Sequence, residues 1–257
     1  MVVSLLLKVV VTPILVSAAT LIGRRWGQVL SGWLVGLPLT SGPVVFFLAV
    51  DQSRPFAADA SLGVILGVAS QAVFALAYVW IPGSIGWPVR VLAGTAAFTA
   101  ATIAFRLVRM PAVLEPMVVI ACLLAAILLM PRIEEVAPVV APPAGDLPVR
   151  IVVATLLVVG LTTVAPYLGS FLSGLVSPFP LYAAMLAVFA HRLGGPAAAA
   201  EVWRGLLFGL FSFLAFFTVL AAVLVPVGIA FGFLLAIAAA VTLQGVSLVI
   251  LRARPAN

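Results

Sequence analysis

The feature that most constrains this chain is a series of apolar runs, each long enough to cross a lipid bilayer. A crossing helix needs about 20 mostly apolar residues. Because hydrocarbon offers the backbone no hydrogen-bond partners, such runs fold as helices. The sequence therefore predicts an all-α polytopic membrane protein of about nine transmembrane helices, near residues 2–21, 27–50, 60–81, 88–107, 111–130, 148–167, 168–190, 202–225 and 228–251.

Composition agrees with this class. Hydrophobic residues make up 65% of the chain and charged residues 8%, whereas charged residues make up about 25% of a soluble domain. The net charge of +6 comes from residues scattered between apolar runs, so membrane lipids are the expected partners and nucleic acid is not. Since the first seven residues carry no charged side chain, we interpret the first run as a retained span and not a signal peptide. The sequence leaves open whether the chain forms a homo-oligomer.

An internal duplication organises the chain. Paired glycines, prolines, serines and a cation at one fixed spacing indicate two copies of one unit. A shift of 142 residues superimposes Lys8 on Arg150, Gly27 on Gly169, Ser31 on Ser173, Gly32 on Gly174, Pro38 on Pro180, Phe47 on Phe189, Gly63 on Gly205, Gly67 on Gly209, Ser70 on Ser212 and Phe74 on Phe216.

The duplication predicts the domain organisation. The copies cover spans one to four and six to nine, and the fifth span has no counterpart. An odd span between two four-span units forces the second unit to cross the membrane in the opposite sense. We therefore expect a first four-helix repeat over 1–107, a linker helix and loop over 108–147, and a second, inverted four-helix repeat over 148–257.

The basic residues predict the orientation. Four of them, Lys8, Arg54, Arg106 and Arg109, fall on the side of the N-terminus, and nine fall on the other side. Because basic residues are in excess on the cytoplasmic side, we expect the C-terminus in the cytoplasm and the N-terminus outside, in the inner (plasma) membrane of a bacterium.

Two of the predicted spans are interrupted at matching positions, over 31–43 and 173–180. Prolines there remove helical hydrogen bonds, and glycines allow close approach of another backbone. Interrupted helices at matching positions of inverted halves point to a binding site near the midplane. The predicted substrate-binding residues are Ser31, Gly32, Pro38, Thr40, Ser41, Ser173, Gly174, Ser177 and Pro180. The alternative is that the prolines only kink the helices while the small residues pack.

Charged residues within the apolar runs supply further candidates. Lys8 and Arg150 occupy equivalent positions and either form an anion-binding pair or extend their charged ends to the interface. Glu115 opens the fifth span and is a candidate for proton coupling, as an intramembrane carboxylate. An ion pair of Glu115 with Arg106 and Arg109 is the alternative.

His191, the only histidine, could sense protons or simply be solvated at the interface. Small residues in the third and eighth spans follow the spacing that brings membrane helices into contact. Those residues are Gly63, Gly67 and Ser70, with Gly205, Gly209 and Ser212. We interpret them as packing residues and expect these two helices to cross the interrupted ones.

Residues for enzyme chemistry are scarce. One histidine and one cysteine, Cys122, fall short of a zinc site. The sequence contains no recognisable nucleophile, base and orienting group and no glycine-rich phosphate loop. We therefore predict neither an enzyme nor a bound metal or cofactor.

Two stretches resemble the GlpM family of small bacterial inner-membrane proteins, Leu5–Lys8 and Ser173–Ala183 followed by Ala190–His191. Members of that family have about the length of one repeat, and the resemblance implies an association with alginate production. The first copy departs from the pattern at Gly36–Pro38 and at Ala49, which stands where the second copy has His191. Fused inverted units are also similar, at the level of fold, to the drug/metabolite transporter superfamily.

The leading functional hypothesis is a secondary transporter or facilitator of a small solute. The solute could be anionic and would bind between the two broken helices, exposed alternately by rocking of the repeats. One alternative is a non-transporting membrane subunit or scaffold of an envelope polysaccharide (alginate-like) biosynthesis system. A lipid-handling protein is a third class, which a cavity open sideways to lipid would indicate.

Overall fold

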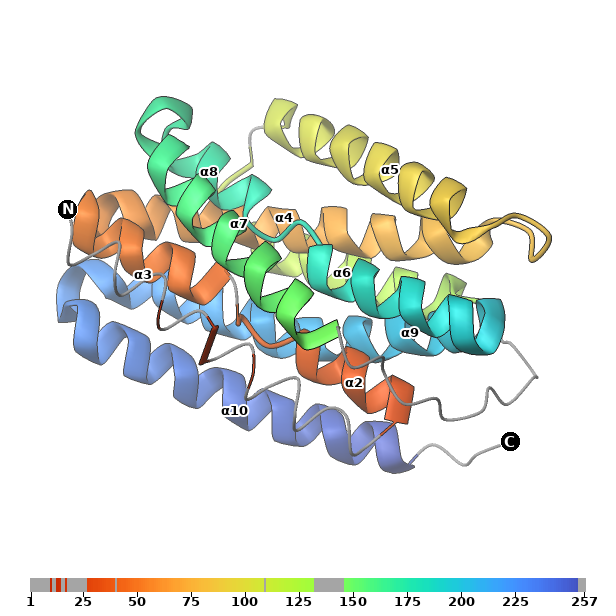
Figure 1. Cartoon of the computed structure of the whole chain (residues 1–257). Coiled ribbons are helices and arrows are strands. Elements are labelled where there is room, and N and C mark those ends of the chain that lie inside the picture. The colour runs from red at the N-terminus through yellow and green to blue at the C-terminus, as the bar shows by residue number, and fades with distance from the viewer. Residues whose placement is uncertain are drawn as a thin grey trace.

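A computed structural model describes residues 10, 13, 14, 17, 27–39, 41–108, 110–131 and 146–253 (Figure 1). Within these residues every regular element is a helix, which confirms the all-α class. Four stretches are long and apolar enough to cross a membrane: Arg54–Trp80, Trp87–Leu107, Ala183–Val227 and Ile229–Val249. The helices are α2 (Gly27–Val35), α3 (Ser41–Asp51), α4 (Arg54–Trp80), α5 (Trp87–Leu107), α6 (Glu115–Leu129), α7 (Asp146–Leu168), α8 (Ser170–Val176), α9 (Leu181–Val227) and α10 (Ile229–Ala253).

Helix α4 begins earlier than the predicted span at 60–81. The Ser53 side chain accepts a hydrogen bond from the Phe56 N–H at 3.2 Å, and Pro55 lies in the first turn. A serine cap and a first-turn proline are both favourable at a helix N-terminus, because the first N–H groups have no partner inside the helix. Hydropathy alone does not detect this polar first turn.

Both predicted interruptions are present, and they have the same backbone hydrogen bonds. Across the first, between α2 and α3, the Leu39 N–H bonds the Leu37 carbonyl at 2.7 Å and the Gly42 N–H bonds the Pro38 carbonyl at 2.9 Å. Across the second, between α8 and α9, the equivalent bonds are Leu181 to Phe179 at 2.7 Å and Ala184 to Pro180 at 2.8 Å. Proline therefore ends one helix and caps the next in the same way at both places.

Helix α9 consists of two helical parts. Gly195 has φ +74° and ψ −172°, a conformation that glycine adopts readily and other residues rarely, and Pro196 follows it directly. The helix therefore changes direction at Gly195. At its other end Gly228, with φ +85°, connects it to α10.

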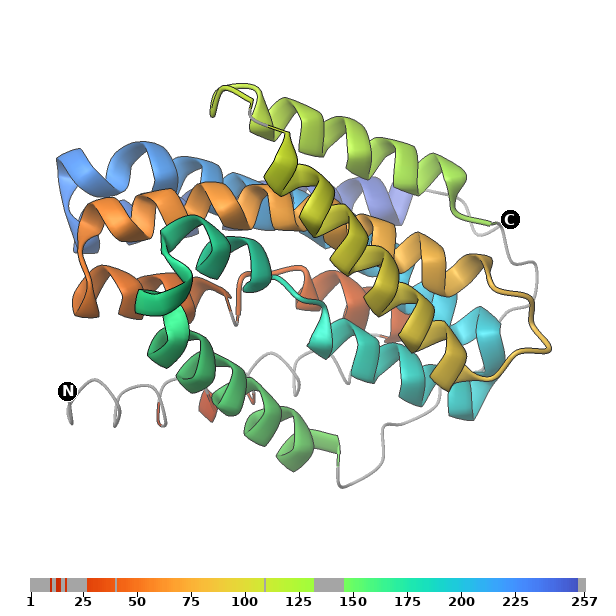
Figure 2. The ribbon, with the colours of Figure 1, turned by 90° about the horizontal axis from the view of Figure 1, so that it is seen from above.

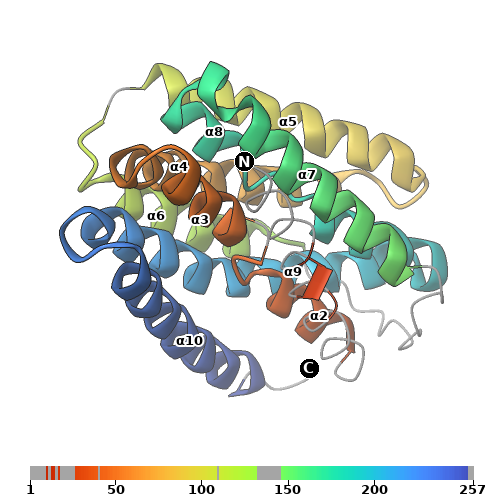
Figure 3. The same ribbon diagram turned by 60° about the vertical axis from the view of Figure 1, so that its left-hand side comes forward.

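Helix α4 and the second part of α9 form the centre of the bundle. They pack on each other, while α5 packs on α4 and α10 packs on α9, so that α5 and α10 lie at opposite edges (Figure 3). Helix α6 packs on α4 and α9, and α7 packs on α3 and α8; Figure 2 shows α6 and α7 on opposite sides of the central pair.

The interrupted helices run in opposite directions. In Figure 1 the chain passes from right to left through α2 and α3, and from left to right through α8 and the first part of α9. The helices that follow them are also opposed, since α4 runs to the right and the second part of α9 runs to the left.

Candidate functional site

The two breaks meet inside the bundle. The Ser41 hydroxyl, at the start of α3, donates to the Ser177 carbonyl, at the end of α8, over 3.1 Å. Both residues are fully buried. The Ser177 hydroxyl is also buried and has no hydrogen-bond partner among the residues described. The structure thus brings together one predicted site residue from each half.

The contacts between the halves are reciprocal. For three pairs of glycines, a residue of one half faces a residue of the other, and their counterparts 142 positions away face each other too. The backbone neighbours of the small residues follow this rule: Gly32 faces Val202 while Gly174 faces Ala60, Gly63 faces Phe171 while Gly205 faces Val29, and Gly67 faces Leu175 while Gly209 faces Trp33.

These neighbours confirm that the glycines of the third and eighth spans pack against the interrupted helices. A Cβ on Gly63 would overlap the Phe171 carbonyl oxygen, and a Cβ on Gly205 would overlap the Val29 carbonyl oxygen. Gly32 is equally crowded by the Val202 carbonyl oxygen. In this conformation Gly32 and its counterpart Gly174 lie in helix contacts.

The remaining predicted site residues are dispersed. Lys8 and Thr40 lie outside the described residues, and Ser31 and Arg150 lie in α2 and α7 with side chains that the structure does not describe. The Ser173 hydroxyl donates to the Gly169 carbonyl of its own segment at 2.7 Å. Pro180 is buried at the start of α9. The anion-binding pair of Lys8 and Arg150 therefore stays a prediction.

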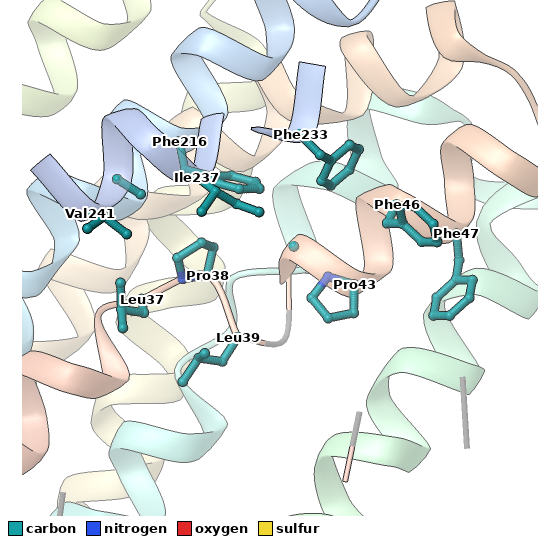
Figure 4. Close-up of a pocket in the computed structure, with 12 residues that line it drawn as sticks. Leu37, Pro38, Leu39, Pro43, Phe46, Phe47, Phe216, Phe233, Ile237 and Val241 are labelled. Carbon is teal, nitrogen blue, oxygen red and sulfur yellow. The ribbon is translucent and has the colours of Figure 1, made fainter. Parts of the chain in front are cut away.

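A pocket of about 550 Å³ adjoins the first break (Figure 4). Pro38 lies on its wall, while Phe216 comes from α9 and Phe233 from α10. Every lining residue within the described part of the chain is apolar. The described lining consists of Leu37, Pro38, Leu39, Gly42, Pro43, Phe46, Phe47, Phe216, Phe233, Ile237, Ala240 and Val241.

The equivalent region of the second half is filled by aromatic rings. Phe179, the counterpart of Leu37, packs edge-on against Phe74 with ring centroids 6.0 Å apart. It also packs edge-on against Phe98 at 5.2 Å. The counterpart of Phe98 is Ala240, so the first half has smaller side chains at two of these three positions. The two halves therefore share a backbone arrangement but differ in their interior.

A polar network lies one helical turn beyond the pocket. Gln244 of α10 donates to the Trp33 carbonyl at 2.9 Å and accepts from the Ser212 hydroxyl. The Trp33 indole donates to the Ser247 hydroxyl at 2.8 Å. The network joins α2, α9 and α10 in the apolar interior. In the other half, Thr102 and Ser70 stand at the positions equivalent to Gln244 and Ser212, and they bond each other at 3.0 Å.

Aromatic and polar side chains gather where α4 ends and α5 begins. Arg90 is 2% exposed and donates to the carbonyls of Tyr78, Pro82 and Ile85 at 3.1, 2.7 and 3.0 Å. Its guanidinium lies 5.9 Å from the Tyr78 ring centroid. Because it satisfies three carbonyls at the C-terminal end of α4, Arg90 holds the α4–α5 connection.

Tyr78 also contacts two rings of α9. Its ring centroid lies 5.4 Å from that of Trp203 and 6.4 Å from that of His191. The Tyr78 hydroxyl, the Trp203 indole nitrogen and His191 Nδ1 are buried without hydrogen-bond partners among the described residues. His191 is thus partly buried, with its Nδ1 side against the bundle.

Glu115 lies at the first position of α6 and is 5% exposed. Among the described residues, its Oε2 atom has no hydrogen-bond partner. The carboxylate of Asp59 in α4 acts electrostatically on Glu115 and accepts a hydrogen bond from the Ser170 hydroxyl. Arg106 is exposed, and Arg109 lies outside the described residues. Within the described chain the alternative of an Arg106–Glu115 ion pair is therefore not observed.

Several of these residues gave only weak signals in the sequence. Gln244 and Ser247 are three residues apart in the last apolar run, where uncharged polar side chains commonly bond neighbouring helices. Trp33 and Trp203 are indistinguishable from ordinary apolar residues by hydropathy. Continuing the 142-residue shift into the fourth and ninth spans would have paired Thr102 with Gln244.

Comparison with protein-family models, with curated proteins and with solved structures finds no match to this chain. The resemblance to the GlpM family therefore stays a prediction from the sequence, and function has to be argued from the geometry of the bundle.

Proposed function

We propose that this protein is a secondary transporter or facilitator of a small solute, built from two inverted four-helix repeats joined by α6. The opposed directions of α2–α3 and α8–α9 support the inverted arrangement (Figure 1). So do the contacts of the small residues. Val29 faces Gly205 and Trp33 faces Gly209, so α2 runs parallel to the second part of α9. That part of α9 is the counterpart of α4, and α4 runs in the opposite direction (Figure 1).

The single observation that carries the proposal is the reciprocity of the contacts between the halves. When two residues are in contact and their two counterparts are in contact as well, the halves are related by a two-fold axis. Transporters built from inverted repeats have such an axis in the membrane plane, with the solute site near the midplane at the repeat interface. In the present proposal the meeting point of Ser41 and Ser177 marks that site.

The difference between the halves supports alternating exposure. A pocket adjoins the first break, while Phe74, Phe98 and Phe179 occupy the equivalent space beside the second. In the proposed orientation the pocket lies in the outer half of the membrane and the aromatic cluster in the inner half. Rocking of one repeat against the other would open the second space and close the first.

Glu115 is the proposed coupling residue. A buried carboxylate oxygen without a partner, beside a second carboxylate, is a natural place for a proton to bind and leave. The charge of the solute is a separate prediction, based on Lys8 and Arg150. The proposed location is the bacterial inner membrane with the C-terminus in the cytoplasm, based on the distribution of basic residues.

The experiment that tests transport asks whether the meeting point is reached from both sides. In a Cys122→Ala background, Ser177→Cys removes only a hydroxyl that has no described partner. We expect a membrane-impermeant thiol reagent to modify Cys at 177 when it is added to either side of oriented vesicles, in separate experiments. Gly160→Cys, at an exposed position of α7 with open space around it, should react from neither side because it faces lipid.

Modification of position 177 from one side only, or from neither, would contradict alternating access. A static scaffold subunit predicts that result, so the experiment also separates the leading proposal from the polysaccharide-scaffold alternative.

A further inference from the structure

The pocket at the first break borders the outer surface of the bundle. Ile237 and Val241 of α10 line it and are still 50% and 61% exposed. Helix α10 lies at the edge of the bundle, packed on α9, and its other exposed large side chains are apolar. In a membrane this surface contacts lipid, so the pocket opens beside α10 toward the hydrocarbon of the bilayer.

The lining selects a hydrocarbon occupant. Each of the twelve lining residues that the structure describes is apolar, so a polar group placed among their side chains would lose its hydrogen bonds to water without replacement. The polar network around Gln244 lies beyond the pocket, and its donors bond the Trp33 carbonyl, the Gln244 side-chain oxygen and the Ser247 hydroxyl. An alkyl chain, in contrast, meets only carbon.

The size of the pocket fits one chain. Its volume of about 550 Å³ falls within the range of about 300 to 1,000 Å³ that small-molecule sites occupy. A methylene group is close in size to a water molecule, whose share of the liquid is about 30 Å³, so the pocket has room for a chain on the order of a dozen methylenes.

The pocket is open because two of its side chains are smaller than their counterparts in the second half. The aromatic contacts of Phe179 with Phe74 and Phe98 close the equivalent space in the second half. Leu37 and Ala240 replace Phe179 and Phe98 at the pocket. An aromatic ring at either position would reproduce the filled arrangement that this backbone already accommodates elsewhere in the same molecule.

We propose that the solute is a single-chain amphiphile, of the fatty-acid type, whose alkyl chain enters the pocket from the bilayer beside α10. This inference rests on the proposed transport function and names its substrate class. A carboxylate headgroup would also agree with the prediction of an anionic solute.

The test uses the full chain in lipid nanodiscs and a fatty acid that carries a diazirine in the middle of its alkyl chain. After irradiation, peptide mass spectrometry locates the labelled residues. We expect labels on the pocket segments of α3 and α10. Ala240→Phe and Leu37→Phe should each reduce this labelling about tenfold, a change equivalent to about 1.4 kcal/mol and within the usual cost of overfilling a packed site.

Ala238→Phe is the matched control, because it places the same ring on an exposed face of α10 outside the pocket lining. It should label like the unmodified protein. A variant that fails to fold is recognised by a broadened gel-filtration profile, and two independent filling variants keep the test decisive.

Labelling spread evenly over the exposed apolar positions, or unchanged by both filling variants, would overturn the inference. Equal labelling of the pocket by a two-chain phospholipid with the same diazirine would also overturn it, because the pocket would then hold ordinary lipid. Neither result affects the two-sided modification of position 177, so failure of the substrate class is distinguishable from failure of the proposed transporter.

Discussion

At the scale of single residues, glycine decides how closely the two halves approach. Gly32, Gly174, Gly63 and Gly205 each lie against a backbone carbonyl of the other half, where a Cβ would overlap the oxygen. Within a membrane, helices gain no hydrophobic energy by leaving lipid, so close packing of small residues supplies much of their attraction. The identity of these residues therefore controls the interface between the halves.

Gly174→Ala should destabilise the protein, because the new methyl group would meet the Ala60 backbone and backbone cannot move aside as a flexible side chain can. We expect a loss of about 1–3 kcal/mol or more, measured by chemical unfolding in detergent. Gly160→Ala introduces the same methyl group where no described atom lies within 4 Å, so stability should be unchanged or slightly higher, because alanine favours the helix more than glycine does. Equal stability of the two variants would contradict the described helix contact.

Glu115→Gln tests proton coupling at the same scale. Glutamine has nearly the same shape but cannot bind and release a proton. If protonation of Glu115 shifts the balance between conformations, the ratio of inner-side to outer-side modification at position 177 should change across the neutral pH range, and Glu115→Gln should remove that change. The ratio cancels the ionisation of the thiol itself.

Glu201→Gln, toward the end of the bundle where Trp203 meets Tyr78, is the control and should retain the pH response. A response that persists in Glu115→Gln would assign coupling to another group.

At the scale of elements, polar side chains fix how α9 and α10 are aligned. Gln244 links Ser212 of α9 to the Trp33 carbonyl of α2, while Thr102 and Ser70 link α5 to α4 in the other half. The two pairs occupy equivalent positions but differ in reach, because glutamine is long enough to join a third helix. The two halves therefore have side-chain hydrogen bonds at equivalent positions, but different residue types make them.

Gln244→Leu should weaken this alignment, since it removes both bonds and leaves the Trp33 carbonyl without that donor. Interhelical hydrogen bonds in membrane proteins average about 0.6 kcal/mol and reach about 1.7 kcal/mol, so a loss in that range is expected in unfolding experiments. Thr242→Val is the control, because Thr242 is exposed on α10 and bonds only its own helix at Ala238. A loss as large in Thr242→Val would indicate an effect of helix propensity and not of the network.

At the scale of the whole molecule, the proposed inverted arrangement makes a prediction about the two sides of the membrane. The α4–α5 connection, which contains Ser84, and the end of α9 at Val227 occupy similar places in the two proposed repeats. In a Cys122→Ala background, Ser84→Cys should be labelled by an impermeant maleimide from the cytoplasmic side and Val227→Cys from the outside. Labelling of both positions from one side would contradict inverted repeats.

The sequence anticipated much of the architecture because the relevant signals are local. The helical class follows from apolar runs, and both interruptions follow from prolines that fix the backbone wherever they stand. The packing role of Gly63 and Gly205 followed from small-residue spacing. The position at which a helix starts, such as Arg54, was harder to predict, because a helix cap depends on one serine and not on hydropathy.

By itself, then, the sequence determined the helical, membrane-embedded class, the duplication and the two breaks, since each depends on neighbours within one run or on a fixed spacing between runs. Only the tertiary structure decided that Ser41 meets Ser177. It also decided that Leu37 and Ala240 border a pocket, while their counterparts Phe179 and Phe98 fill the equivalent space in the second half. The physical reason is that these features arise from side chains far apart in the chain, whose sizes matter only when the folded backbone brings them together.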